Sequence, residues 1–170
     1  CTPEDLTRYG TKLTPKSSLV TLIKALLAET RFSWIRLLYL FPSPIVFELA
    51  ELMNEEPRIC KYIDMPLQHA SGKILKAMNR PELSQGLPEM VTKLRAICPE
   101  IAIRSAFIVG FPGETPEDVA ILSQFLESSH PDRAGFFSYS DEEGTPAHSM
   151  RHKVPARITA KRIEQLAHLQ

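Results

Sequence analysis

The sequence predicts an α/β protein in which parallel strands are covered by helices. Short β-rich runs alternate with amphipathic helical stretches along the 170 residues. The β-rich runs are almost continuously apolar, as is typical of parallel strands buried on both faces. Right-handed crossovers between such strands produce either an open doubly wound sheet or a piece of a barrel. Periodicity alone does not choose between these two architectures.

Four runs are predicted to form strands. The first stops at Pro42 and the second at Pro66, because proline cannot donate to a sheet ladder. The third is the most β-like run of the chain and is closed by Gly110. Four strands with helices between them would make half of an eight-stranded barrel. The predicted strands span residues 34–40, 62–65, 101–109 and 134–139.

Helices are predicted between the strands from their caps and their apolar spacing. Thr115, followed by Pro116 and by Asp118, indicates a helix start close to a capping box. Pro88 must lie in the first turn of its helix, because an interior proline costs about 3 kcal/mol. Ser17 or Ser18 can cap the first helix, and Ser71 can cap the third. The predicted helices cover about residues 19–27, 45–54, 73–78, 84–97, a stretch after 115, and 155–170.

Composition excludes several broad functions. Twenty basic residues balance twenty acidic ones, so net charge does not direct the chain to nucleic acid or to a membrane. The basic residues between Arg151 and Arg162 are interpreted as a solvated helix face. No apolar run is long enough to span a bilayer. We therefore expect a cytoplasmic protein without a membrane partner.

The three cysteines do not form a recognisable framework. Cys1, Cys60 and Cys98 are widely spaced and include no Cys-x-x-Cys pair, so reduced thiols are expected. Cys60 and Cys98 are expected to be core residues rather than nucleophiles. The histidines are scattered, and no metal site is predicted. Because the sequence begins with cysteine and not methionine, we expect it to be part of a longer protein.

Ligands of parallel α/β proteins lie beyond the carboxyl ends of the strands. After the second strand, Gln68 and His69 offer an amide and an imidazole to a polar ligand. His69 is equally expected to do no more than cap or orient the following helix. After the third strand, the glycines of residues 110–113 would let a ligand's ring approach the backbone, although a tight turn is the alternative. Carboxylates such as Asp64, Asp141, Glu142 and Glu143 could serve acid–base work, but most of them are interpreted as surface charges.

Six segments taken together resemble the radical S-adenosylmethionine methylthiotransferases. The Pro-Leu-Gln-His-Ala-Ser run at residues 66–71 favours the branch that modifies an aspartate of a small-subunit ribosomal protein. The sister branch, which modifies tRNA adenosine, typically has Pro-Val-Gln-Ser-Gly-Ser there. The six segments are Thr7-Arg-Tyr-Gly10, Trp34-Ile-Arg-Leu-Leu-Tyr-Leu-Phe-Pro42, Tyr62-Ile-Asp-Met-Pro-Leu-Gln-His-Ala-Ser71, Ile74-Leu-Lys-Ala-Met-Asn-Arg80, Arg104-Ser-Ala-Phe-Ile-Val-Gly-Phe-Pro-Gly-Glu-Thr115 and Glu143-Gly-Thr-Pro146.

The resemblance implies a fold and an incomplete domain. It places residues 1–170 on the last four strand–helix units of a six-stranded partial, TIM-like barrel. The N-terminal cluster-binding part and a small C-terminal β-domain of the family are absent from the sequence. Glu4 and Asp5 stand where the family more usually has Gln-Asp. The substrate implied is a small-subunit ribosomal protein, with possible contact to the ribosome and an unidentified electron donor.

The resemblance also implies cofactors. The family uses S-adenosylmethionine twice, once as a methyl donor and once as a radical source, together with two [4Fe–4S] clusters. The Cys-x-x-x-Cys-x-x-Cys ligands of the radical cluster are not in this chain, so the chain alone is expected to be inactive. No catalytic residue is assigned. Residues expected to contact the cofactor are Gln68, His69, Arg104, Ile108, Gly110, Phe111 and Ser138.

Three alternatives remain open from the sequence. The chain could belong to the tRNA-modifying branch, or it could be a non-catalytic remnant that keeps a cofactor-binding cleft. An ordinary barrel lyase is a poor fit, because such an enzyme needs a lysine or a carboxylate at a strand's carboxyl end. The clear strand ends here offer Pro42, Pro66 and Gly110 instead.

Overall fold

The computed structural model describes residues 5–83 and 86–170 of the chain. This part contains six α-helices, three β-strands and three short 3-10 helices. The helices are α1 (Leu19–Glu29), α2 (Ile45–Glu55), α3 (Gly72–Ala77), α4 (Leu87–Ile97), α5 (Pro116–Ser129) and α6 (Ala156–Ala167). The strands are β1 (Tyr62–Asp64), β2 (Ala102–Val109) and β3 (Arg133–Ser138), and the 3-10 helices are η1 (Leu6–Arg8), η2 (Pro81–Leu83) and η3 (Pro146–Ser149).

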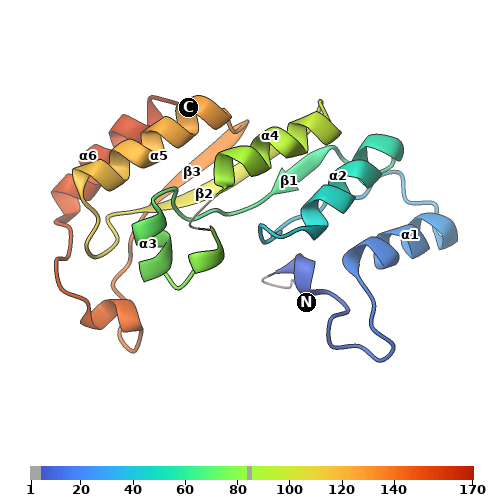
Figure 1. Cartoon of the computed structure of the whole chain (residues 1–170), viewed down its shortest axis with the longest axis horizontal. Coiled ribbons are helices and arrows are strands. Elements are labelled where there is room, and N and C mark those ends of the chain that lie inside the picture. Colours follow the sequence, from blue (N-terminus) through green and yellow to red (C-terminus); the bar gives the residue numbers. More distant parts are fainter. Residues whose placement is uncertain (1–4, 84–85) are drawn as a thin grey trace. The chain divides into compact units, whose positions relative to one another are not determined.

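The chain forms two compact units. The first comprises Cys1–Pro66 and Val91–Arg104, and the second comprises Leu67–Met90 and Ser105–Gln170. Strand β2 therefore contributes its first residues to one unit and its last residues to the other, and the strands are ordered β1-β2-β3 (Figure 1). The α/β class with parallel strands predicted from the sequence is confirmed.

The first unit is built from α1, α2 and the parallel pairing of β1 with the start of β2. Helix α1 begins as predicted, with the Ser18 hydroxyl accepting the Thr21 N–H at 3.2 Å. Helix α2 packs against α1 and buries Leu49 and Met53. In the ladder, Ile63 of β1 is paired with Ile103 of β2, and both are buried.

The strand predicted at residues 34–40 is wrong. In the described chain this segment makes one isolated parallel bridge, between Ile35 and Ile59, and no ladder. A strand needs a neighbour along its length, and Trp34, at 62% exposed, lies outside the core. Tyr39 has φ of 58°, so the backbone leaves the extended conformation before the predicted end. Three strands form where four were predicted.

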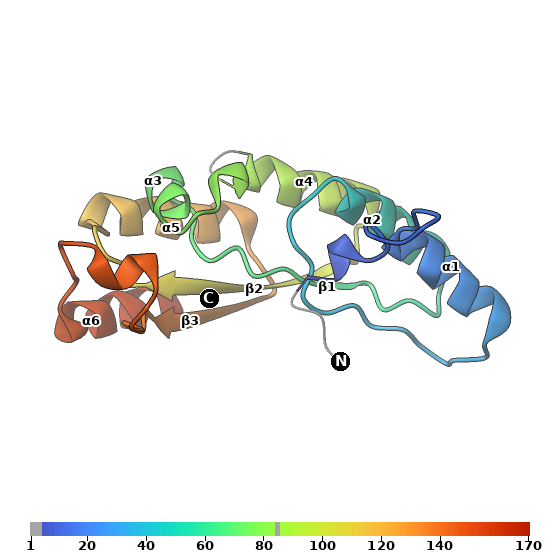
Figure 2. The ribbon, with the colours of Figure 1, turned by 90° about the horizontal axis from the view of Figure 1, so that it is seen from below.

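The second unit surrounds the remainder of β2. Figure 2 shows α3 and α5 on one side of β2, while α6 packs against β3. Side chains alternate along the strand, with Phe107 and Val109 buried and Ile108 half-buried on the other face. The ring of Phe107 stacks on Phe136 at 5.8 Å and meets Phe125 edge-on at 6.1 Å. These aromatic contacts form the centre of the unit.

The predicted helices are confirmed, with small shifts at their ends. Pro88 lies in the first turn of α4, as expected, whereas the predicted helix start at Ser84 is outside the described residues. Cys98 is buried, Cys60 is half-buried, and Cys1 is outside the described residues. Among the residues that the structure describes, no helix combines the length and apolar character that a membrane span requires.

The position of Phe107 yields a stability prediction. Phe107→Ala is expected to lower the free energy of unfolding by about 3–5 kcal/mol, because it leaves a cavity between two other rings. Phe137→Ala is the matched control, since Phe137 is 54% exposed on the neighbouring strand and its loss should change stability by less than about 0.5 kcal/mol. Urea unfolding followed by circular dichroism measures both, and equal losses would contradict this core.

Candidate functional site

A cavity of about 250 Å³ lies in the second unit, where β2 and β3 reach their carboxyl ends. This is where parallel α/β folds place their ligands. Two residues predicted from the sequence, Gly110 and Ser138, line the cavity. The other lining residues are Tyr139, Asp141, Lys153, Val154, Ala156 and Thr159.

Gly110 is required by the geometry of the cavity wall. Its φ of +84° lies in the left-handed region, which residues with a side chain rarely adopt. A Cβ at this position would also come within 2.7 Å of Cγ2 of Thr159, and closer still to its hydroxyl. The turn after β2 and helix α6 therefore touch at this point, and no larger residue fits between them.

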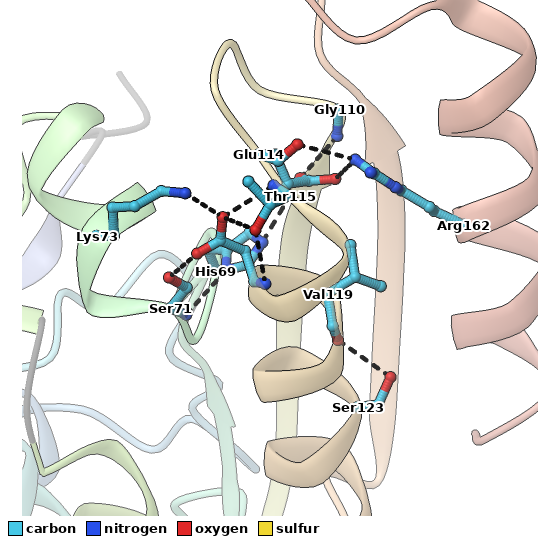
Figure 3. A network of polar contacts seen from close by, with 10 residues as sticks. His69, Ser71, Lys73, Gly110, Glu114, Thr115, Val119, Ser123 and Arg162 are labelled. Atoms are coloured by element: carbon cyan, nitrogen blue, oxygen red, sulfur yellow. Dashed lines mark hydrogen bonds and ion pairs between the residues drawn. The ribbon is translucent and has the colours of Figure 1, made fainter.

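The Glu114 carboxylate is buried behind this turn and is the centre of the polar network in Figure 3. Oε2 accepts the Gly110 N–H at 2.8 Å, and Oε1 accepts Nη1 of Arg162 at 2.7 Å. Nε2 of His69 lies 3.6 Å from Oε2, an ion-pair distance longer than a hydrogen bond. Burial alone would raise the pKa of Glu114, but the contacts with His69, Gly110 and Arg162 outweigh it and lower the pKa.

His69 is fully buried and orients the start of α3. Its Nδ1 accepts the Ser71 N–H at 2.9 Å, which is the orienting role that the sequence left open as an alternative. A side chain without exposed surface acts on a ligand only through its neighbours. The cofactor contact of His69 stays a prediction, and the structure places its Nε2 beside the Glu114 carboxylate.

A second buried carboxylate, Asp118, joins α3 to the first turn of α5. It accepts Nζ of Lys73 at 2.5 Å and the Ser71 hydroxyl at 2.6 Å, and it closes the predicted capping box with Thr115. Burial opposes ionisation, but the Lys73, Ser71 and Thr115 hydrogen bonds lower the pKa of Asp118 to about 2. Ser71 occupies the predicted cap position but uses its hydroxyl on Asp118 rather than on the helix.

In the first unit, Asp64 is buried, so it is an exception among the carboxylates that were mostly expected at the surface. It accepts Nη1 of Arg104 at 2.7 Å and the Tyr39 N–H at 3.3 Å. Asp64 and Arg104 are register partners of parallel strands, which brings their side chains to the same face. The carboxylate raises the pKa of Arg104, whose side chain remains 44% exposed and available to a ligand.

The remaining predicted residues lie in the second unit. Gln68 pairs with β2 through its backbone, accepting the Ile108 N–H at 2.8 Å, and its side chain is half-buried. Phe111 is buried, and its ring meets Tyr139 edge-on at 5.2 Å. Ser138 is exposed at the end of β3. The structure thus brings Gly110 and Ser138 to the cavity and places Phe111 against Tyr139, which lines it.

Asp141 is exposed, as predicted, but it belongs to the cavity rim. It accepts Nζ of Lys153 at 2.5 Å and the Tyr139 hydroxyl at 3.0 Å. The hydrogen bond from Lys153 is the main cause of the lowered pKa of Asp141. Lys153 also donates to the Ala147 carbonyl at 2.9 Å, so it fastens the loop between β3 and α6.

Arg162 and Thr159 are site residues that the sequence reasoning missed. The basic stretch is exposed at Arg151, Lys153 and Arg157, as interpreted, but the Arg162 side chain is only 12% exposed. A signal was present, because Thr159, Arg162 and Leu166 recur at helical spacing on one face. Thr159 and Leu166 are both buried, which places Arg162 toward the protein and not toward solvent.

Comparison with known proteins finds relatives that share one name. No protein-family model matches the chain. The ribosomal protein uS12 methylthiotransferase RimO of Desulforudis audaxviator is 49% identical over 98% of this chain. Proteins of the same name from Desulfotalea psychrophila and Geobacter sulfurreducens are each 46% identical over the same share. The predicted family resemblance is confirmed. The chain spans 37–38% of the length of these three relatives.

The similarity to these RimO methylthiotransferases extends over 167 of the 170 residues of the chain. Within the described residues there is no group of three or more histidine, cysteine or acidic side chains placed as metal ligands.

The turn at Gly110 gives a second prediction. Gly113→Ala should cost about 1–2 kcal/mol, because Gly113 also has a positive φ of 82° but open space around it. Gly110→Ala should cost a further 1–3 kcal/mol, roughly, from overpacking against Thr159. Adding Thr159→Ala should recover part of the second loss only. Chemical denaturation of the three variants measures this, and equal costs at the two glycines would contradict the contact with α6.

Asp118 gives a prediction about pH. Its pKa in the folded chain is about 2, against an ordinary value of 3.8, so it stabilises the fold above about pH 4, and this contribution is lost as the pH falls toward 2. The difference corresponds to about 2 kcal/mol. The stability gap between the parent chain and Asp118→Asn should therefore close by that amount in acid. Glu127→Gln, an exposed change on the same helix, should leave the pH dependence unaltered; a gap that stays constant down to pH ~2 would contradict the Asp118 contacts.

Proposed function

We propose that this chain is part of an enzyme that adds a methylthio group to ribosomal protein uS12. The observation that carries the proposal is the similarity to proteins named for that activity, at 43–49% identity over 98% of the chain. Since the chain spans little more than a third of those proteins, the activity is proposed for the whole protein that contains it. The aspartate of uS12 is the proposed site of modification.

The proposed architecture is the last four strand positions of a six-stranded partial barrel. The parallel ladder of β1 with β2 and the order β1-β2-β3 support it. Residues 34–40 would occupy the first of the four positions. The parallel bridge of Ile35 with Ile59 is consistent with a strand at that place once its other edge has a neighbour.

The cavity at the ends of β2 and β3 fits an adenosyl cofactor. Gly110 leaves the backbone open to a ring, Tyr139 supplies an aromatic surface that Phe111 contacts edge-on, and the Ser138 hydroxyl can donate or accept. When bound, S-adenosylmethionine supplies the methyl group and the radical chemistry. Gln68, Arg104 and Ile108 are proposed as further contacts of the cofactor. His69 is proposed to act on the cofactor indirectly, through Glu114.

The described residues do not fit a [4Fe–4S] cluster. Their cysteines are Cys60 and Cys98, and burial raises the pKa of the Cys98 thiol, which disfavours the thiolate that iron requires. The two clusters that this function requires are therefore proposed to take their ligands from outside this chain. The residues of this chain bind and orient the cofactor and keep water from it.

The test is the mass of uS12 in the source organism. Deleting the gene should leave the target peptide of uS12 without its methylthio group, and the intact full-length gene should restore it. Mass spectrometry of the isolated ribosomal protein reads this out. Nucleosides from the tRNA of the same cells serve as the control and should be unchanged.

Two results would overturn the proposal. Loss of methylthio-adenosine from tRNA, with uS12 unaffected, would assign the protein to the tRNA-modifying branch. Unchanged uS12 and unchanged tRNA in the deletion strain would indicate a remnant that binds the cofactor without catalysis.

A further inference from the structure

Arg162 reaches from α6 to the turn that carries Gly110 (Figure 3). Its Nη1 donates to Oε1 of Glu114 at 2.7 Å and to the Glu114 carbonyl at 3.3 Å. The other carboxylate oxygen, Oε2, accepts the Gly110 N–H at 2.8 Å. One buried carboxylate thus connects a helix side chain to the backbone of the cavity wall.

The same helix also lines that cavity. Ala156 and Thr159 of α6 line it, and Thr159 packs against Gly110. Arg162 lies three residues after Thr159, so it occupies the same face of the helix, one turn further along. Contact at Thr159 and the ion pair at Arg162 together set the separation of α6 from the turn. That separation determines the width of the cavity.

We propose that Arg162 is a positioning residue for the cofactor cavity: it fixes α6 against the turn of residues 110–114 so that the cavity keeps the width that an adenosyl group needs. This inference rests on the proposed function, in which S-adenosylmethionine occupies the cavity. Arg162 does not line the cavity itself, and its effect passes through Glu114 and Gly110.

An arginine suits this position better than a lysine. Nη1 of its planar guanidinium donates to both the carboxylate and the carbonyl of Glu114, and the rigid plane fixes the direction of these N–H groups, whereas the ammonium of a lysine is a compact charge on a flexible stem. Loss of Arg162 alone would leave the Glu114 carboxylate buried with less compensation. Loss of both charges is less disruptive, because no unpaired charge then remains inside the protein.

Equilibrium dialysis of labelled S-adenosylmethionine against the full-length protein tests the proposal. Arg162→Met should weaken binding by about tenfold or more, as expected when binding groups are displaced without being removed. Lys161→Met, an exposed change on the adjacent residue, should leave binding unchanged. Arg162→Lys should be intermediate, and the double variant Glu114→Gln with Arg162→Met should bind more tightly than Arg162→Met alone.

Steady-state kinetics separates positioning from a general loss of structure. The KM for S-adenosylmethionine should rise in Arg162→Lys, which is expected to fold, while the KM for uS12 stays unchanged. A parallel rise in both KM values, or binding by Arg162→Met and Arg162→Lys equal to that of Lys161→Met, would overturn the inference. Failure of the unaltered full-length protein to bind S-adenosylmethionine would instead overturn the proposed function, so the two failures are distinguishable.

Discussion

The buried carboxylate of Glu114 is the constraint on which the candidate site depends. An ionised carboxylate taken out of water is costly unless hydrogen bonds and opposite charge replace the water. Here the replacement comes from the Gly110 N–H, from Arg162 and from the neighbouring His69. These groups belong to the turn after β2, to helix α6 and to the loop before α3. Keeping Glu114 ionised therefore requires that all three segments hold their places, and the cavity wall is formed from two of them.

Two other buried carboxylates are also paired with a basic side chain. Asp64 is paired with Arg104, and Asp118 is paired with Lys73, each within its own unit. Each of the three ion pairs joins residues that are 40 to 48 positions apart in the chain. Fully satisfied polar groups of this kind fix a single arrangement of loops more sharply than apolar packing does. The loops they fix are those that follow β1 and β2, where we propose that the cofactor binds.

Features of the fold and the site that depend on neighbouring residues were predictable from the sequence, and those that depend on distant residues were not. The start of α5 was predictable, because Thr115, Pro116 and Asp118 form a cap within four residues. The burial of Asp64 and Glu114 was not predictable, because it depends on arginines far away in the sequence, and the sequence does not show that they lie beside these carboxylates. Residues 34–40 have a local strand pattern, but a strand forms only with a partner along its edge. The basic stretch that contains Arg162 predicts a solvated surface, although Arg162 lies on the buried face of α6.

The central claim is that the cavity at the ends of β2 and β3 receives the adenosyl cofactor. The most direct measurement is photolabelling of the full-length protein with an azido-adenosyl analogue of S-adenosylmethionine, followed by peptide mapping. The account predicts label on the peptide that contains Gly110 and Phe111 or on the one that contains Ser138 and Tyr139, with protection by unlabelled S-adenosylmethionine. Protectable label confined to other peptides of the protein would contradict it.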